Sequence, residues 1–145
     1  MSSGKEFPDR IPAQPSVDGF LDALKYDADG LVTIVVQDAD NNAVLMVAFA
    51  NREAVRKTLE TGLMHYYSRS RKKMWLKGEE SGHTQKMLSM TVDCDGDAIV
   101  AKCRQVSGAC HLGFRSCFAF QVERDGKVTV VGEKLFDPKE VYKKK

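Results

Sequence analysis

The second half of the chain consists of short runs of apolar and β-branched residues, and this pattern most restricts the possible folds. From Leu63 onward the runs that predict strands are MHYYSRS, MWLK, KMLSMTVDCD, AIVAKCRQV, SCFAFQVE and VTVVGEKLF. The dipeptides Asp95-Gly96 and Asp125-Gly126 each separate two of these runs. Such dipeptides favour the twisted two-residue turns of β-hairpins. The sequence therefore predicts a mostly antiparallel sheet.

The first half of the chain adds a hairpin and two helices. The apolar runs LVTIVVQD and VLMVAFA flank the turn-forming segment ADNNA, which predicts a hairpin. Ser16 is suited to cap a short helix that we expect to end near Gly30. Asn51 and Gly62 are suited to cap the two ends of a helix formed by REAVRKTLET. We expect an α+β, mainly β fold: a mostly antiparallel sheet or pseudo-barrel with two short helices near the N-terminus.

Length and composition indicate one globular domain. A chain of 145 residues, with 43% hydrophobic and 29% charged residues, can bury a core of ordinary size. The net charge of +2 is too small to indicate nucleic-acid binding. The longest apolar stretch, residues 44–50, is too short to span a membrane, and the N-terminus has no apolar signal segment. We expect a cytoplasmic protein with no membrane partner, whose four cysteines are reduced.

The ends of the chain differ from its middle in composition. Residues 1–15 contain three of the four prolines and no apolar period, so we expect a flexible N-terminal arm. The folded domain is expected to span residues 16–142. The last three residues, 143–145, are lysines and are expected to form a solvated basic tail.

The segment DCDGD places three carboxylates and a thiol in five residues. Asp93 and Asp95 alternate along a predicted strand and so share a face, and the turn can return Asp97 toward them. Three adjacent carboxylates repel one another unless a cation neutralises them, and oxygen ligands suit a hard ion such as Mg²⁺. An acidic hairpin turn without an ion is the alternative. Cys94 is expected to point to the opposite face of the strand.

Cys94 has candidate partners for a second metal in the segment GACHLGFRSC, namely Cys110, His111 and Cys117. Soft or borderline ligands with an open fourth position are typical of a catalytic zinc site, which lowers the pKa of bound water to about 7. His111 follows Cys110 directly, and an imidazole beside such a water can act as a general base. The spacing is not that of a CxxC zinc knuckle, so the pattern alone leaves a core role for these cysteines open.

The remaining cysteine and the other histidines have less distinctive surroundings. Cys103 follows Ile99 and Ala101 on one face of a predicted strand, which favours a position in the core. The chain has two further histidines, His65 and His83, so the general base could be any of the three.

Basic, hydroxyl and aromatic side chains gather in the segment YYSRSRKKMWLKGEESGHTQK. Guanidinium and hydroxyl groups such as those of Arg69, Ser70 and Arg71 suit a phosphate, and an aromatic face such as that of Trp75 suits a purine. An edge strand with a solvated basic face is the alternative for any one of them. Because the basic residues are local, a phosphorylated nucleotide fits better than a long nucleic acid.

Three motifs in this order, SRSRKKMWLKGEESGHTQ, VDCDGDAIVAKCRQ and GACHLGFRSCF, resemble the phosphoribosyl-AMP cyclohydrolases. These enzymes of histidine biosynthesis open the adenine ring of 1-(5-phosphoribosyl)-AMP. The resemblance covers residues 20–120. It implies a hydrolase in which zinc polarises a water, His111 assists its deprotonation, attack occurs at C6, and the N1–C6 bond breaks to give the formimino product.

The resemblance also implies the cofactors, the partner and the site residues. The family forms homodimers with a zinc site across the interface, which assigns Cys94 from one subunit and Cys110 and Cys117 from the other as zinc ligands. It assigns Asp93, Asp95 and Asp97 to Mg²⁺. The residues expected to bind substrate are Arg69, Ser70, Arg71, Trp75, His83 and Arg115.

Some features depart from the family pattern or leave alternatives. Leu112 stands where the family often has Thr, and Ala50 where it often has Met. Because the chain stops at Lys145, we expect the form without a fused pyrophosphohydrolase domain. One alternative is a nucleotide-binding module with a structural zinc, which needs a fourth protein ligand such as Cys103 or His111. A base deaminase is a weaker alternative because the H-x-E…P-C-x-x-C signature is missing.

Overall fold

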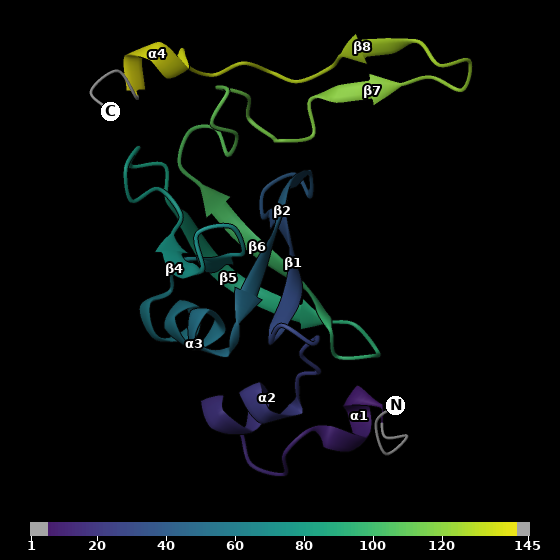
Figure 1. Cartoon of the computed structure of the whole chain (residues 1–145), viewed down its shortest axis with the longest axis vertical. Helices are drawn as coiled ribbons and strands as arrows, with labels where there is room; N and C mark the ends of the chain where they lie inside the picture. The colour runs from purple at the N-terminus through teal and green to yellow at the C-terminus, as the bar shows by residue number, and fades with distance from the viewer. Residues whose placement is uncertain (1–5, 142–145) are drawn as a thin grey trace.

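A four-stranded sheet forms the centre of the computed structural model, which describes residues 6–141 (Figure 1). Its strands are β1 (Leu31–Asp38), β2 (Val44–Asn51), β5 (Gln85–Val92) and β6 (Ala98–Gln105), in the order β2-β1-β6-β5. The β1–β2 and β5–β6 pairs are antiparallel hairpins, whereas β1 and β6 run parallel. The mainly β class is therefore confirmed, and the sheet is mixed.

The parallel pair follows from how the two hairpins are connected. Residues 52–84 lie between them and form a helix and a separate hairpin before the chain returns as β5. This long connection allows β6 to pair with β1 in the same direction, as parallel strands require. Residue periodicity predicts strands but carries no signal for which strands pair, so the sequence could not show this.

The other elements lie around this sheet. The remaining strands are β3 (His65–Ser68), β4 (Lys73–Leu76), β7 (Phe120–Val122) and β8 (Val128–Val130), and the helices are α1 (Phe7–Arg10), α2 (Val17–Ala23), α3 (Arg52–Thr61) and α4 (Pro138–Val141). β3–β4 and β7–β8 form separate two-stranded sheets, and no sheet in residues 6–141 closes into a barrel. The predicted pseudo-barrel is not seen, and the homodimer stays a prediction. No helix in this part of the chain is long and apolar enough to cross a membrane.

The two predicted helices begin at the expected caps. The side-chain oxygen of Ser16 accepts a hydrogen bond from the backbone N–H of Gly19 at 2.9 Å. The side-chain oxygen of Asn51 accepts a hydrogen bond from the backbone N–H of Ala54, also at 2.9 Å. Gly62 adopts φ 79° and donates its N–H to a helical carbonyl, which ends α3 as predicted.

The helix α2 is shorter than predicted because a turn competes with it. It ends at Ala23 and not near Gly30. The carboxylate of Asp27 accepts hydrogen bonds from the N–H groups of Asp29 and Leu31 at 2.8 and 2.9 Å. A side chain that captures nearby backbone donors in this way favours a turn over a helix.

The described part of the predicted N-terminal arm lies against the β5–β6 turn. The backbone N–H of Phe7 donates to the carbonyl of Cys94 at 3.1 Å, and Arg10 donates to the carbonyls of Ala23 and Asp95. Gly96 adopts φ 80° in this turn, and a side chain there would meet Arg10 at 2.6 Å. The flexibility of residues 1–15 stays a prediction, and the basic tail 143–145 lies outside the described residues.

The core lies on the inward face of the sheet. Alternate residues of the two central strands are fully buried, as a half-buried strand requires: Val32, Ile34, Val36, Ile99, Ala101 and Cys103. The predicted core position of Cys103 is confirmed. Its burial raises the pKa of the thiol to about 12.

This burial predicts a loss of stability at high pH that depends on Cys103. The unfolded thiol titrates near its ordinary pKa of about 8.5. The stabilisation is therefore complete below that pH and is lost as the pH rises toward the folded-state value. Between about pH 9 and pH 11, the unfolding free energy of the wild type should fall more steeply than that of Cys103→Ala, by up to about 1.4 kcal/mol per pH unit.

Urea unfolding of both proteins with chelator and reductant tests this. The variant should be less stable near neutral pH, by about 1 kcal/mol, because it loses buried atoms. Tyr66 is also buried with a raised pKa and is present in both proteins, so only the smaller part of its shift that Cys103 causes differs between them. If the unfolding free energies of the two proteins fell in parallel as the pH rose, the prediction would be contradicted.

Candidate active site

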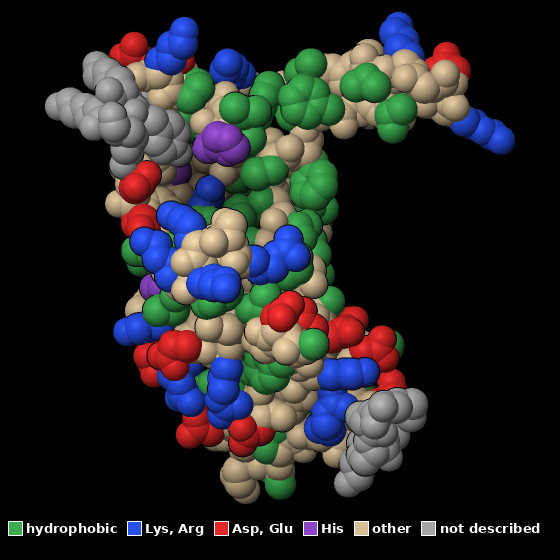
Figure 2. All heavy atoms as spheres, in the orientation of Figure 1, with side chains coloured by type: hydrophobic (Ala, Val, Ile, Leu, Met, Phe, Trp, Pro, Cys, Tyr) green, Lys and Arg blue, Asp and Glu red, His purple; other side chains and the backbone are tan. Residues whose placement is uncertain are grey.

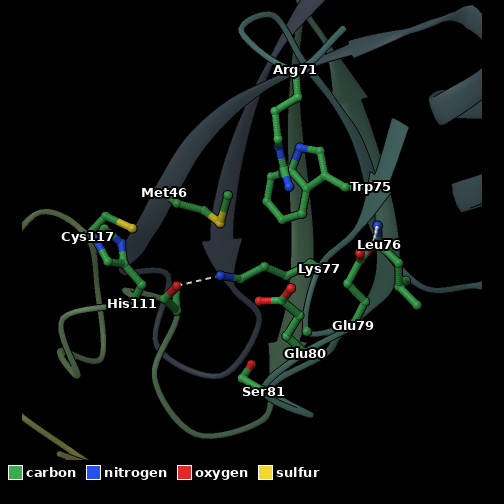
Figure 3. Close-up of a pocket in the computed structure, with 12 residues that line it drawn as sticks. Met46, Arg71, Trp75, Leu76, Lys77, Glu79, Glu80, Ser81, His111 and Cys117 are labelled. Atoms are coloured by element: carbon green, nitrogen blue, oxygen red, sulfur yellow. Dashed lines mark hydrogen bonds between the residues drawn. The ribbon is translucent and has the colours of Figure 1, made fainter. Parts of the chain in front are cut away.

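A cavity of about 320 Å³ lies between the end of β4 and the segment that follows β6 (Figure 3). It is lined by Met46, Arg71, Trp75, Leu76, Lys77, Gly78, Glu79, Glu80, Ser81, Ala109, His111 and Cys117. Figure 3 shows Cys117 and His111 at one end, Arg71 and Trp75 at another, and Lys77 crossing between them. The cavity therefore combines a thiol, an imidazole, basic groups and an aromatic face.

Backbone hydrogen bonds of the segment after β6 hold the two cysteines of this site. The N–H of Cys110 donates to the carbonyl of Phe114 at 3.2 Å, and that of Gly113 donates to the carbonyl of Cys110 at 3.0 Å. The N–H of Cys117 donates to Leu45 of β2 at 2.7 Å, which fixes the far end of the segment against the sheet. Gly113 adopts φ 99°, and a side chain there would collide with the backbone of Phe136.

The two thiols lie close enough to influence each other. Partial desolvation and the neighbouring Cys110 together raise the pKa of Cys117 to about 11, against the opposing effect of the positive charge of Lys77. Cys110 is buried and Cys117 is exposed, and a thiol whose pKa is raised is protonated at neutral pH unless a cation replaces its proton. Cys117 lines the cavity and its thiol lies beside that of Cys110, so the two sulfurs form a donor pair that fits a soft or borderline metal ion.

The third predicted zinc ligand lies elsewhere in the same chain. Cys94 is exposed in the β5–β6 turn, whereas Cys110 and Cys117 follow the other end of β6 (Figure 1). The eight residues of β6 span roughly 26 Å at about 3.3 Å per residue. Cys94 of one chain therefore cannot share an ion with Cys110 and Cys117 of that chain.

The three aspartates of the same turn come together. Ligand oxygens of Asp93, Asp95 and Asp97 all lie within 4.8 Å of one another, and all three residues are exposed. They converge for a different reason from the one expected. β5 ends at Val92, so they lie in the turn and not along a strand. The carboxylate of Asp93 organises this turn by accepting from the N–H of Gly96 at 2.8 Å and from that of Asp97 at 3.1 Å.

The electrostatics of this cluster favour a cation. Partial desolvation, the hydrogen bond to Asp93, and the charges of Asp93 and Asp95 raise the pKa of Asp97. Desolvation also acts on Asp93, but the N–H donors of Asp97, Ala98 and Gly96 outweigh it and lower the pKa of Asp93. A carboxylate whose pKa is raised by neighbouring carboxylates, as that of Asp97 is, is stabilised in its charged form when a cation binds.

Of the three histidines, only His111 lines the cavity. His83 packs edge-on against Phe136, with ring centroids 4.6 Å apart. Burial lowers the pKa of His83, and the ammonium of Lys77 lowers it further. The Nδ1 atom of His65 lies 2.8 Å from the carbonyl oxygen of Leu63, outside the cavity. Geometry therefore favours His111 among the candidate general bases.

A second, more open cavity of about 610 Å³ adjoins the first. It is lined by Val47, Ala48, Phe49, Tyr67, Ser68, Arg69, Ser70, Arg71 and Trp75, so the two cavities share Arg71 and Trp75. The Arg69 guanidinium lies 4.1 Å from the centre of the Phe49 ring. Figure 2 shows lysine and arginine side chains gathered over the β3–β4 hairpin, where these residues lie. Four of the predicted substrate contacts thus border one continuous groove.

Two predicted substrate contacts lie outside both cavities. His83 contacts Phe136, as described above, and Arg115 pairs with Glu133 at 2.9 Å. Conversely, the first cavity is lined by four residues that the sequence did not single out: Lys77, Glu79, Glu80 and Ser81. They lie within one of the family motifs, but a lysine after a strand is usually solvated. No local pattern distinguished Lys77 from its neighbours.

The fold and this groove define a small, mainly β protein in which basic, hydroxyl and aromatic side chains line a groove beside a pair of thiols. The sequence model of the family described as phosphoribosyl-AMP cyclohydrolase matches residues 46–119. This range includes the cysteines and aspartates discussed above.

Individual relatives match over most of their length. The chain is 56% identical over 122 residues to the phosphoribosyl-AMP cyclohydrolase of Methanococcoides burtonii, covering 84% of this chain and 98% of the relative. It is 54% identical over 125 residues to that of Pelotomaculum thermopropionicum, covering 86% and 97%. For Chlorobium phaeovibrioides the identity is 47% over 126 residues, covering 87% and 92%. The chain belongs to the phosphoribosyl-AMP cyclohydrolase family.

Proposed function

We propose that this protein hydrolyses 1-(5-phosphoribosyl)-AMP in histidine biosynthesis. Water adds across the C6–N1 bond of the adenine ring. Its oxygen becomes the carbonyl of a carboxamide at C6, a proton goes to N1, and the C6–N1 bond breaks to give the formimino product. The observation that carries this proposal is the groove in which Cys117 and His111 lie with Trp75 and Arg71, within the range that matches the family.

The proposed ligands of Zn²⁺ are Cys110 and Cys117 of one subunit and Cys94 of the partner subunit. The proximity of the first two thiols supports the pair, and the separation of Cys94 along β6 supports a contribution from a second chain. Zn²⁺ held by such ligands lowers the pKa of a bound water to about 7. The open cavity beside Cys117 leaves room for water and substrate, whereas a purely structural zinc has four protein ligands.

A homodimer is part of the same proposal. The hairpin β7–β8 projects from the body of the chain (Figure 2). One of its faces carries Phe120, Val122, Val128 and Val130, each at least 58% exposed. A two-stranded hairpin with an uncovered apolar face is marginally stable alone. Burial of this face against a second copy would stabilise it.

The chain's own side chains have distinct proposed roles. His111 accepts the proton of the attacking water, since an imidazole can bind and release a proton near neutral pH. Trp75 stacks on the purine, and Arg69, Ser70 and Arg71 bind phosphate at the other end of the groove. His83 and Arg115 stay predicted substrate contacts.

Asp93, Asp95 and Asp97 are the proposed Mg²⁺ ligands, and Mg²⁺ there would position phosphate or ribose oxygens. Because these residues flank Cys94, docking that brings Cys94 to the partner's cavity brings the aspartates there as well. The proposed compartment is the cytoplasm, where the four free cysteines would remain reduced.

Metal removal followed by separate additions tests the proposal. The purified protein is treated with chelator and assayed for phosphoribosyl-AMP opening by absorbance. We expect activity to be lost on chelation, to return in part with zinc, and to return fully with zinc and magnesium together. Recovery with magnesium alone would contradict the role of zinc. Absence of turnover under every condition, with the protein folded, would contradict the proposed function.

A further inference from the structure

Lys77 connects the β3–β4 hairpin to the cysteine segment. It follows β4 directly, and its backbone N–H donates to the carbonyl of Met64 at 3.1 Å. Its ammonium crosses the cavity and donates to the carbonyl oxygen of Ala109 at 2.6 Å, shown as the dashed line in Figure 3. A half-buried ammonium is costly unless it is hydrogen-bonded, so this contact accounts for its inward position.

The bond to Ala109 acts on the peptide group that leads into Cys110. In that peptide the carbonyl of Ala109 accepts from Lys77, and the N–H of Cys110 donates to the carbonyl of Phe114. Both polar groups of one peptide plane are therefore held, from opposite sides. Without Lys77 the carbonyl loses the partner that holds it, and the plane can rotate about its two flanking bonds. Rotation would redirect the side chain of Cys110 relative to Cys117.

The rest of Ala109 is also held in place. Its side chain is 2% exposed within the core, and its own N–H donates to the carbonyl of Arg115 at 2.9 Å.

We propose that Lys77 is a positioning residue for the thiol pair: by holding the Ala109–Cys110 peptide, it sets the orientation of Cys110 toward Cys117 and thereby the affinity for the metal. This inference rests on the proposed function, in which these two thiols bind zinc. The competing role is direct contact with substrate, since Lys77 lines the cavity together with Trp75. The two roles predict different effects on zinc affinity and on KM.

The test compares full-length variants at Lys77. Lys77→Met removes the donor, and Lys77→Gln carries an amide too short to reach Ala109. Lys77→Arg retains a charged donor, and Lys86→Met, an exposed lysine on β5, is the matched control. Zinc affinity is measured by competition with a chelator, and site geometry by the thiolate-to-metal charge-transfer absorption of the cobalt-substituted proteins. Thermal unfolding of the metal-free proteins verifies that each variant is folded.

We expect Lys77→Met and Lys77→Gln to weaken zinc binding by about 10- to 100-fold, as loss of a residue that orients a metal ligand typically does. Their cobalt absorption should be altered, and Lys77→Arg should recover part of both properties. At saturating zinc, KM for phosphoribosyl-AMP should stay within about threefold of the wild type, because substrate binding itself is intact.

Unchanged zinc affinity and cobalt absorption in the folded Met and Gln variants would overturn the inference, above all if KM rose instead. If Lys77→Met does not fold, the zinc affinity and cobalt absorption of Lys77→Gln and Lys77→Arg test the inference in its place. A wild type that binds zinc without opening phosphoribosyl-AMP would contradict the proposed function alone, because the affinity comparison would still test Lys77.

Discussion

Replacing Cys110 with serine is expected to remove zinc binding and phosphoribosyl-AMP opening together. The thiol of Cys117 lines the cavity and lies beside that of Cys110, and one sulfur alone is a weak site. A serine hydroxyl is not deprotonated at neutral pH and is a poor ligand for a borderline metal ion. We expect turnover to fall at least about 100-fold, since metal assistance is worth several kcal/mol. Zinc content and steady-state rates measured on the same preparation check this.

A mixing experiment tests whether the site is shared between subunits. Cys94→Ser and Cys110→Ser should each be inactive alone. In a mixed dimer, one of the two sites combines an intact Cys94 from one subunit with intact Cys110 and Cys117 from the other. After unfolding and refolding of an equal mixture, about a quarter of wild-type activity should return, because half of the dimers carry one intact site of two. No recovery, or wild-type zinc content in Cys110→Ser, would contradict the shared site.

Replacing His111 with alanine is expected to reduce kcat by about 100- to 10,000-fold, the usual contribution of a general base. His111 is the histidine that lines the cavity and lies at the same end as Cys117 (Figure 3). Zinc content should remain at the wild-type level, because the proposed ligands are intact. The measurement is kcat as a function of pH, in which the step attributable to the imidazole should disappear.

His65→Ala is the comparison for this prediction. His65 contacts the carbonyl of Leu63 and does not line the cavity, so its removal should change kcat little. The pair of variants distinguishes loss of one particular imidazole from a general effect of histidine replacement. Near-normal turnover in His111→Ala, with zinc bound, would remove His111 from its proposed role.

Much of the fold was predictable because it depends on local chemistry. The caps at Ser16, Asn51 and Gly62 act on backbone groups within four residues. The Asp-Gly dipeptides lie at the tips of the β5–β6 and β7–β8 hairpins, as predicted, although five residues (93–97 and 123–127) and not two separate the strands of each pair. The predicted helix up to Gly30 was too long because the side chain of Asp27 turns the chain earlier. The parallel pairing of β1 and β6 depends on a connection of more than thirty residues, which no local pattern encodes.

For the candidate site, the residue types were predictable, but the positions of some of the residues were not. The residue types for two metals and a nucleotide are present in the sequence, and the family motifs group them. Four of the predicted substrate contacts line the groove, whereas His83 and Arg115 lie outside it. Lys77 was missed because its contact is with Ala109, thirty-two residues away along the chain.

The sequence by itself determined the helix caps, the strand runs, the hairpin turns and the membership of the chain in its family. These depend on residue identity and on neighbours a few positions apart. The tertiary structure alone decided that β6 separates Cys94 from Cys110 and Cys117, that the three aspartates meet in a turn, and that Lys77 reaches the peptide before Cys110. These features depend on which distant segments pack together, and side-chain periodicity carries no information about that pairing.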